Sequence, residues 1–149
     1  QERIGPAGPG GRTLGLWHQV LDWARQNGAL ELAWVQMDFA RTHAKLEAMR
    51  LLNWKMTAAV ARDSLSGADA GATKTYGTET HVDVYRTLLG ILGAAGRLRP
   101  GSPGAVLAGQ IEQISRQSVV NTFGGGVNEV LRDMVGTLGL GLVREKRAK

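Results

Sequence analysis

A run of three glycines directly before a helical pattern is the feature of this sequence best suited to chemistry. Gly124, Gly125 and Gly126 precede a segment with apolar residues at helical spacing: Val127, Val130, Leu131, Met134 and Val135. Glycine lets a ligand approach the main chain closely, and the free N–H groups of a helix start attract an anion such as phosphate. Asn128 and Glu129 would lie in the first turn of that helix. A turn that binds nothing also explains the pattern, since a glycine run without a preceding strand is a weak phosphate signal.

Other common site chemistries have little support. His18, His43 and His81 fall in different predicted helices, and none stands four residues from another ligand type, so we expect no metal site. No nucleophile-elbow pattern is present, and no serine is paired with a plausible base, which argues against hydrolase chemistry. The chain has no cysteine, so it has neither disulfides nor a thiolate metal site, and a reducing compartment suits it.

The charge is basic, with a formal net charge of +5 and a pI of about 10.1. Much of the excess lies in the tail at residues 142–149, whereas the interior mixes both signs along helix faces. A solvated surface and a basic tail account for this distribution, so we expect no nucleic-acid partner.

The length of 149 residues and 43% hydrophobic content predict one domain, residues 1–149. The apolar runs are too short to span a membrane and no signal peptide is apparent, so we expect a soluble, cytoplasmic protein without a membrane partner. The chain begins with Gln1, which no translation start supplies, and residues 1–11 are rich in glycine and proline. We therefore expect a piece of a longer protein, with residues 1–11 as its cut edge.

Hydrophobic periodicity predicts an all-α fold. Apolar residues recur at three- and four-residue steps in five segments, and the two prolines of 97–104 mark a loop. Short connections between long helices favour antiparallel neighbours, so the expected architecture is an up-and-down bundle of helices at 12–26, 30–65, 68–95, 105–121 and 127–138.

The longest predicted helix carries more apolar surface than one buried stripe needs. Its main stripe comprises Leu32, Val35, Phe39, Leu46, Met49, Asn53, Met56 and Val60. A second apolar set lies off this stripe, and a sister subunit or a further part of the chain would cover it: Trp34, Met37, Leu51, Leu52 and Trp54.

Over essentially its whole length, the chain resembles the C-terminal helical domain of the acyl-CoA dehydrogenase family. The similarity is carried by QERIGPAG at 1–8, LLNW at 51–54, ADAGATK at 68–74 and TFGGGVNEVLRDMV at 122–135. It is greatest to actinobacterial subunits that assemble as α₂β₂ enzymes and oxidise CoA thioesters of cholesterol side chains. The resemblance implies FAD as cofactor, an acyl-CoA substrate and a sister subunit as partner, with N-terminal helical and β domains outside this chain.

Such enzymes remove a proton from the α-carbon of the thioester while the β-hydrogen passes as hydride to FAD, which requires a carboxylate base. The usual glutamate position matches Gly124, and glycine cannot accept a proton. Some family members place the base at the start of the first helix of this domain, where Glu2 matches. The resemblance thus makes Glu2 the catalytic candidate; alternatively Glu2 is a salt-bridged or capping residue, and the sister subunit supplies the base.

The resemblance also implies cofactor-binding residues in two loops: Gly93 and Gly96, and the run Gly124, Gly125, Gly126, Val127, Asn128 and Glu129. Three positions depart from the family pattern. Gln26 matches an arginine, the usual glutamine is missing from the segment 90–96, and Val127 matches a threonine. A flavin site shared with a sister subunit fits these departures better than a site formed by two copies of this chain.

We therefore interpret the sequence as part of a flavin-dependent subunit that catalyses α,β-dehydrogenation of bulky, steroid-derived acyl-CoA. The fragment alone is expected to be inactive. A non-catalytic partner that stabilises a catalytic subunit is the first alternative, and a helical interaction module is the second.

Overall fold

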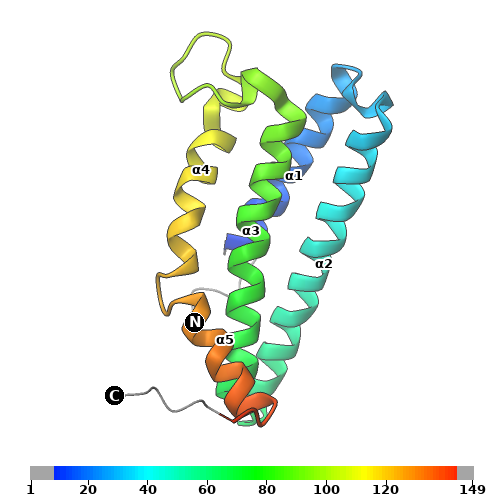
Figure 1. The fold of residues 1–149 in the computed structure, drawn as a ribbon. Coiled ribbons are helices and arrows are strands. Elements are labelled where there is room, and N and C mark those ends of the chain that lie inside the picture. Colours follow the sequence, from blue (N-terminus) through cyan, green and yellow to red (C-terminus); the bar gives the residue numbers. More distant parts are fainter. Residues whose placement is uncertain (1–8, 144–149) are drawn as a thin grey trace.

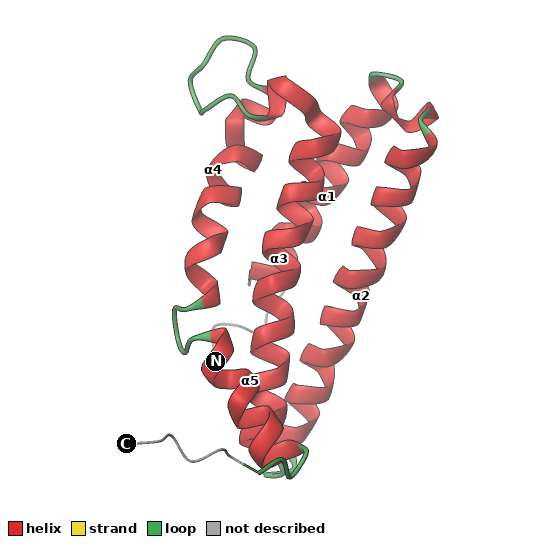
Figure 2. Cartoon of the chain, viewed as in Figure 1, coloured by secondary structure: helices red, strands yellow, loops and turns green. Residues whose placement is uncertain are grey.

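The computed structural model describes residues 9–143, and within this range the chain is helical with no strand (Figures 1 and 2). Five α-helices and four short helical segments follow one another. The α-helices are α1 (Pro9–Gln26), α2 (Ala33–Ala61), α3 (Gly67–Gly96), α4 (Gln110–Ser118) and α5 (Asn128–Met134). Between and after them lie η1 (Ala29–Glu31), η2 (Val106–Gly109), η3 (Val119–Thr122) and η4 (Val135–Gly139), the last a π-helical turn. The all-α fold predicted from periodicity is confirmed.

The bundle is built around α3, which packs against α1, α2, α4 and α5 (Figure 1). The helices α1, α2 and α3 alternate in direction, while α4 and α5 together cover the length of α3 (Figure 1). No described helix is long and apolar enough to cross a bilayer.

Local sequence explains where α3 begins. The Ser66 side chain accepts a hydrogen bond from the amide of Asp69 at 3.0 Å, and its hydroxyl donates to the Asp69 carboxylate at 2.7 Å. This cap satisfies a backbone donor of the first helical turn. Ser66 and Gly67 therefore start α3, and α2 ends at Ala61 rather than at the predicted residue 65.

The segment expected to form one helix at 105–121 is instead divided into η2, α4 and η3. Leu107, Ala108 and Gly109 have φ values of 49°, 53° and 74°, so the chain makes a left-handed turn before α4 begins. A Cβ at Gly109 would lie 2.5 Å from the backbone nitrogen of Pro100. The loop after α3 therefore lies in close contact with the backbone of Gly109. This tertiary contact occurs at the point where α4 begins, five residues later than predicted.

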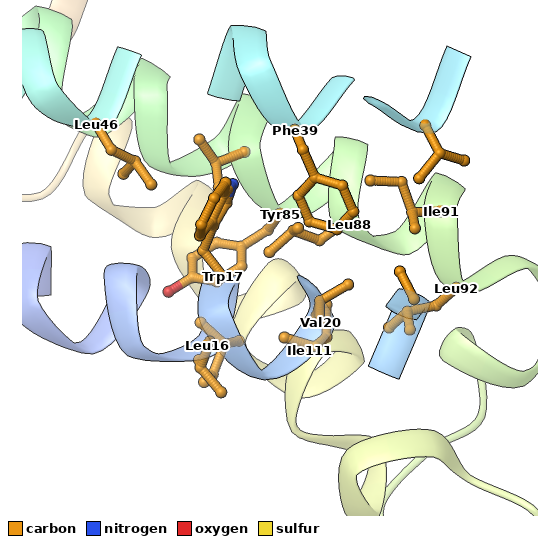
Figure 3. Close-up of a cluster of buried hydrophobic side chains, with 14 of the residues drawn as sticks. Leu16, Trp17, Val20, Phe39, Leu46, Tyr85, Leu88, Ile91, Leu92 and Ile111 are labelled. Carbon is orange, nitrogen blue, oxygen red and sulfur yellow. The ribbon is translucent and has the colours of Figure 1, made fainter. Parts of the chain in front are cut away.

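The hydrophobic core joins α1, the first half of α2, the second half of α3, and α4 (Figure 3). Leu88 lies at its centre and is fully buried, as are Val20, Val35 and Val84. Two buried polar contacts fix its register: Trp17 Nε1 donates to Thr42 Oγ1, and Thr13 Oγ1 shares a hydrogen bond with Tyr85 Oη, both at 2.8 Å.

Several predicted core positions prove exposed. The buried stripe of α2 runs only from Val35 to Met49, since Asn53 and Met56 are half-buried and Leu32 and Val60 are about half exposed. The off-stripe residues Trp34, Met37, Leu51 and Trp54 are 51–61% exposed and Leu52 is half-buried, so residues 9–143 leave most of the second apolar set of α2 uncovered.

Candidate functional site

The glycine loop, residues 122–127, connects η3 to α5. Its first half is held locally, because the amides of Phe123 and Gly124 both donate to Val120 O, at 3.3 and 2.8 Å. Its second half adopts conformations that side chains disfavour, with φ of 71° at Gly125 and 113° at Gly126. The glycine types at 125 and 126 are therefore required by the path of the backbone.

The outer side of the loop presents main-chain donors. Within the part of the chain that the structure describes, the amides of Gly125, Gly126 and Val127 donate no hydrogen bond. These residues are exposed, and apolar side chains close to them in the sequence are exposed too: Val119, Val120, Phe123 and Val130. Backbone donors at an exposed glycine turn near apolar side chains can bind carbonyl or phosphate oxygens of a partly apolar ligand.

The position of Gly124 is tight as well as uncharged. A Cβ there would lie 3.1 Å from Val120 O, so a larger side chain would require the backbone to move by a few tenths of an ångström. A glutamate at this position would therefore need a shifted backbone, and the loop residues 122–127 themselves carry no carboxylate.

Asn128 points into the protein rather than toward the open side of the loop. Its side chain is 2% exposed. Asn128 Oδ1 accepts from Lys74 Nζ at 2.8 Å, and Asn128 Nδ2 donates to Thr78 Oγ1 and Glu79 Oε1, both at 3.1 Å. The amide group thereby fixes the start of α5 against α3, and the geometry gives Asn128 a supporting role next to the loop.

Sequence reasoning missed the polar partners on α3. Lys74 and Thr78 lie one helical turn apart on the side of α3 that faces α5, and Glu79 Oε2 accepts from Arg132 at 2.6 Å. The signal was weak: Lys74 stands in the segment ADAGATK, but nothing local in the sequence shows which loop it reaches.

The predicted site residues fall into two separate groups. Gly93 has φ 65° and ψ −144° and interrupts α3 near its C-terminal end, with open space around it, whereas Gly96 is buried against Leu92. The glycine loop contacts α3 at Lys74, 19 residues earlier, or about 28 Å along the helix at 1.5 Å per residue. A small ligand cannot touch both groups in one chain.

Two carboxylates belong to the loop region. Glu129 is exposed in the first turn of α5, beside the open face of the loop. Glu79 is engaged by Asn128 and Arg132. Glu2, the catalytic candidate, lies outside the described residues.

The three histidines occupy distinct environments. His18 contacts Leu14 O through Nδ1 at 2.9 Å, and the ring of His43 packs 5.3 Å from that of Trp17. His81 is buried in α3, and desolvation holds its pKa below the usual value. Among residues 9–143, no three side chains of the metal-binding types come together.

Comparison with known proteins places these features in a family. The family model for the acyl-CoA dehydrogenase C-terminal domain matches residues 2–139. The acyl-CoA dehydrogenase FadE26 of Mycobacterium tuberculosis is 39% identical over 155 residues, covering 98% of this chain and 38% of its own length. FadE29 of the same organism is 34% identical over 146 residues, covering 94% of this chain and 37% of its own length.

Solved structures agree in fold. The Tcur3481-Tcur3483 steroid ACAD matches with a TM-score of 0.91 and 75% identity, covering 97% of this chain and 38% of that one. The ChsE4-ChsE5 complex of Mycobacterium tuberculosis matches with a TM-score of 0.84 and 40% identity, covering 96% of this chain and 38% of that one. The chain thus spans less than two fifths of the length of these relatives. The match over nearly all of its residues shows that the chain belongs to the acyl-CoA dehydrogenase family and corresponds to the family's C-terminal domain.

Proposed function

We propose that this chain is the C-terminal helical domain of one subunit of an FAD-dependent acyl-CoA dehydrogenase, which oxidises the α,β-bond of bulky, steroid-derived acyl-CoA together with a sister subunit. The observation that carries the proposal is the exposed glycine loop at the family's base position, with Gly124 in place of a carboxylate. The names of the similar structures, a steroid ACAD and a two-component complex, support the substrate class and the partner.

The described residues fit part of a flavin site. The amides of Gly125, Gly126 and Val127, which have no acceptor within the described residues, suit oxygen acceptors of the cofactor or of the thioester, and Glu129 follows them in the first turn of α5. Gly93 and Gly96 would serve a second contact region at the far end of α3. Asn128 would act indirectly, because its amide is already bound to α3. When bound, the flavin supplies the hydride acceptor; the chain supplies binding and orientation.

The base must come from elsewhere than the loop. Gly124 has no titratable group, and the Glu79 carboxylate is paired with Arg132 at 2.6 Å. Glu2 at the start of this domain, or a carboxylate of the sister subunit, would take the α-proton. The missing side chain at 124 also leaves space at the loop, which favours a bulky acyl group over a straight chain.

The exposed apolar face of α2 supports a sister subunit. Trp34, Met37, Leu51 and Trp54 expose about half or more of their surface. Several large apolar side chains exposed along one helix favour an interaction surface. A neighbouring subunit that covered them would also bring its own residues toward the bundle.

The visible spectrum of the full-length protein tests the proposal. It would be recorded for the protein purified alone and after co-expression with candidate sister subunits, before and after anaerobic addition of a steroid acyl-CoA. We expect flavin absorbance only with a partner, and bleaching on addition of substrate. Absence of flavin from every preparation would refute the cofactor assignment, and turnover of short straight-chain thioesters alone would refute the substrate class.

A second candidate function is a non-catalytic subunit that stabilises a catalytic one. The departures at Gln26, Gly90 and Gly124 favour it. Replacing Glu2 by glutamine in the intact complex separates the two functions. A loss of turnover of a hundredfold or more with flavin retained would support Glu2 as the base, whereas unchanged turnover would assign the base to the partner.

A further inference from the structure

Oxygen atoms from the two ends of the glycine loop converge on the ammonium group of Lys74. Lys74 Nζ donates to Gly126 O, to Asn128 Oδ1 at 2.8 Å and to Thr122 O at 3.4 Å. An ammonium group has three donors that can point in different directions, which suits three acceptors spread around one loop. Hydrogen bonds to a charged donor are also stronger than neutral ones.

The second half of the loop depends on this lysine. In the described chain, the main-chain bonds to Val120 O hold Phe123 and Gly124, but the amides of Gly125 and Gly126 donate to no acceptor. Both glycines have positive φ and much conformational freedom, so ordering them is entropically costly. The Lys74 contacts at Thr122 and Gly126 close the loop across this otherwise unsupported stretch.

The same contact decides which way the loop points. In a planar trans peptide, the carbonyl oxygen and the N–H of the next residue point in opposite directions. Since Gly126 O points inward to Lys74, the amide of Val127 points away from α3, toward the open side. Lys74 thereby sets the direction of a donor that faces the proposed site without itself lying on that face.

We propose that Lys74 is a positioning residue for the reaction: by holding Gly126 O and Thr122 O, it keeps the glycine loop in the form that lines the flavin and thioester site. The effect on turnover rests on the proposed function, whereas the effect on the loop rests only on the contacts described above. The partners Asn128 and Glu79, with Arg132 on α5, hold the lysine's own surroundings in place.

Lys74→Met in the full-length complex tests the inference, since it keeps the length of the side chain and removes the donors. Gly71→Ala is the matched control. It lies nearly one turn earlier on α3, where an added Cβ would meet Met134 Cε at 2.9 Å, so the end of one flexible side chain between α3 and α5 must shift while the loop is not touched. Together the two variants separate loss of loop positioning from general weakening of this contact.

The first readout is hydrogen exchange of the loop amides. The amides of Phe123 and Gly124 are the hydrogen-bonded ones in segment 123–127 of the described loop, so loss of the charge-assisted hydrogen bonds of Lys74 predicts exchange at least about tenfold faster at these two amides in Lys74→Met. In Gly71→Ala the increase should instead lie in α5 and η4. Loop exchange within twofold of wild type in Lys74→Met, or the same loop increase in Gly71→Ala, would overturn the inference.

The second readout is the reaction itself. We expect Lys74→Met to shift the flavin absorbance band and to lower kcat by about tenfold to hundredfold with a smaller change in KM, because misplaced groups slow the chemical step. Gly71→Ala should keep the wild-type spectrum. Normal turnover and spectrum in Lys74→Met despite faster loop exchange would overturn the positioning role and leave the proposed function intact. A wild-type complex without flavin would refute the proposed function only. The exchange measurement would still test whether Lys74 keeps the glycine loop in place.

Discussion

The two ends of the bundle are stabilised by different physics. At the core end, the second half of α3 packs with α1, α4 and the first half of α2 around buried apolar side chains such as Leu88 and Ile111. At the loop end, the first half of α3 buries Gly71, Thr75, Thr80 and His81 but no large apolar side chain, and residues 50–61 of α2 bury nothing. The loop end instead relies on polar contacts, and it carries the glycine loop. We infer that the core end gives the domain its stability, while the loop end keeps unsatisfied surface for ligand and partner.

Leu88→Ala should produce the largest effect, because Leu88 is fully buried at the centre of the core end. Removing a buried leucine side chain leaves a cavity and costs about 2–5 kcal/mol. Hydrogen-exchange protection of the α3 amides in the full-length protein would measure this loss. Leu51→Ala, at a site 55% exposed, is the control and should change protection little. Equal losses in the two variants would contradict the division between core and surface.

Asn128→Ala probes the loop end in the same way. The substitution leaves Lys74, Thr78 and Glu79 without an amide partner, at a cost of about 1–3 kcal/mol. Because the core end contributes nothing to this network, exchange should accelerate in α5 and the glycine loop but not in α1. Asn121→Ala, at an exposed asparagine of η3, is the control. Acceleration that spread through the whole bundle would show that the two ends unfold as one unit.

This contrast also explains which parts of the structure could be predicted from the sequence. Periodicity reports which side chains face an apolar core, so it found the five helical regions and the core residues Val35, Phe39 and Leu46. The left-handed turn at Leu107 could not be foreseen, because it accompanies the approach of Gly109 to Pro100 in space.

The polar contacts of the loop end were harder to predict from the sequence. Lys74 and Asn128 are 54 residues apart, and a single hydrogen-bonded pair has no periodic signature. The glycine loop was recognisable from its glycines and from the family resemblance, but the inward direction of Asn128 was not. The roles of the glycines, Val127 and Glu129 toward a cofactor stay predictions, as does the role of Glu2 as base.

The pH dependence of stability should be traceable to His81, which lies where the two ends meet. Its side chain is 9% exposed, and Nε2 has no hydrogen-bond partner within the described chain. Burial lowers the pKa of His81, so the unfolded chain binds a proton at pH values where the folded chain does not. Stability should therefore fall as the pH drops through about 6.5, the ordinary histidine value, and level off below the folded pKa.

One proton limits the size of this effect to about 1.4 kcal/mol per pH unit. Hydrogen exchange of α3, corrected for intrinsic rates, at pH 7 and pH 5.5 would measure it in wild type and in His81→Gln. We expect a shallower dependence in the variant. If the pH dependence of stability is the same in His81→Gln as in wild type, titratable groups other than His81 cause the acid sensitivity.

The smallest effect on stability and the most selective effect on assembly are expected at the exposed face of α2. Leu51→Ser removes an apolar side chain that the chain itself leaves 55% exposed, so protection should change by no more than about 0.5 kcal/mol. If a sister subunit covers this face, the same change should weaken the complex by about tenfold or more, because buried interface side chains carry most of the binding energy.

Leu138→Ser is the matched control for that measurement, since Leu138 is even more exposed, at 71%, but lies in η4 away from the α2 face. Dissociation of the purified complex on dilution would be compared for both variants. A loss confined to Leu51→Ser would identify the α2 face as the subunit contact. Equal weakening of the complex by both variants would mean that the partner contacts the loop end as a whole. If neither variant weakens the complex, the α2 face is not a subunit contact. Weakening of the complex by either variant would make the stability of the loop end a property of the assembly, whereas the stability of the core end is a property of the domain.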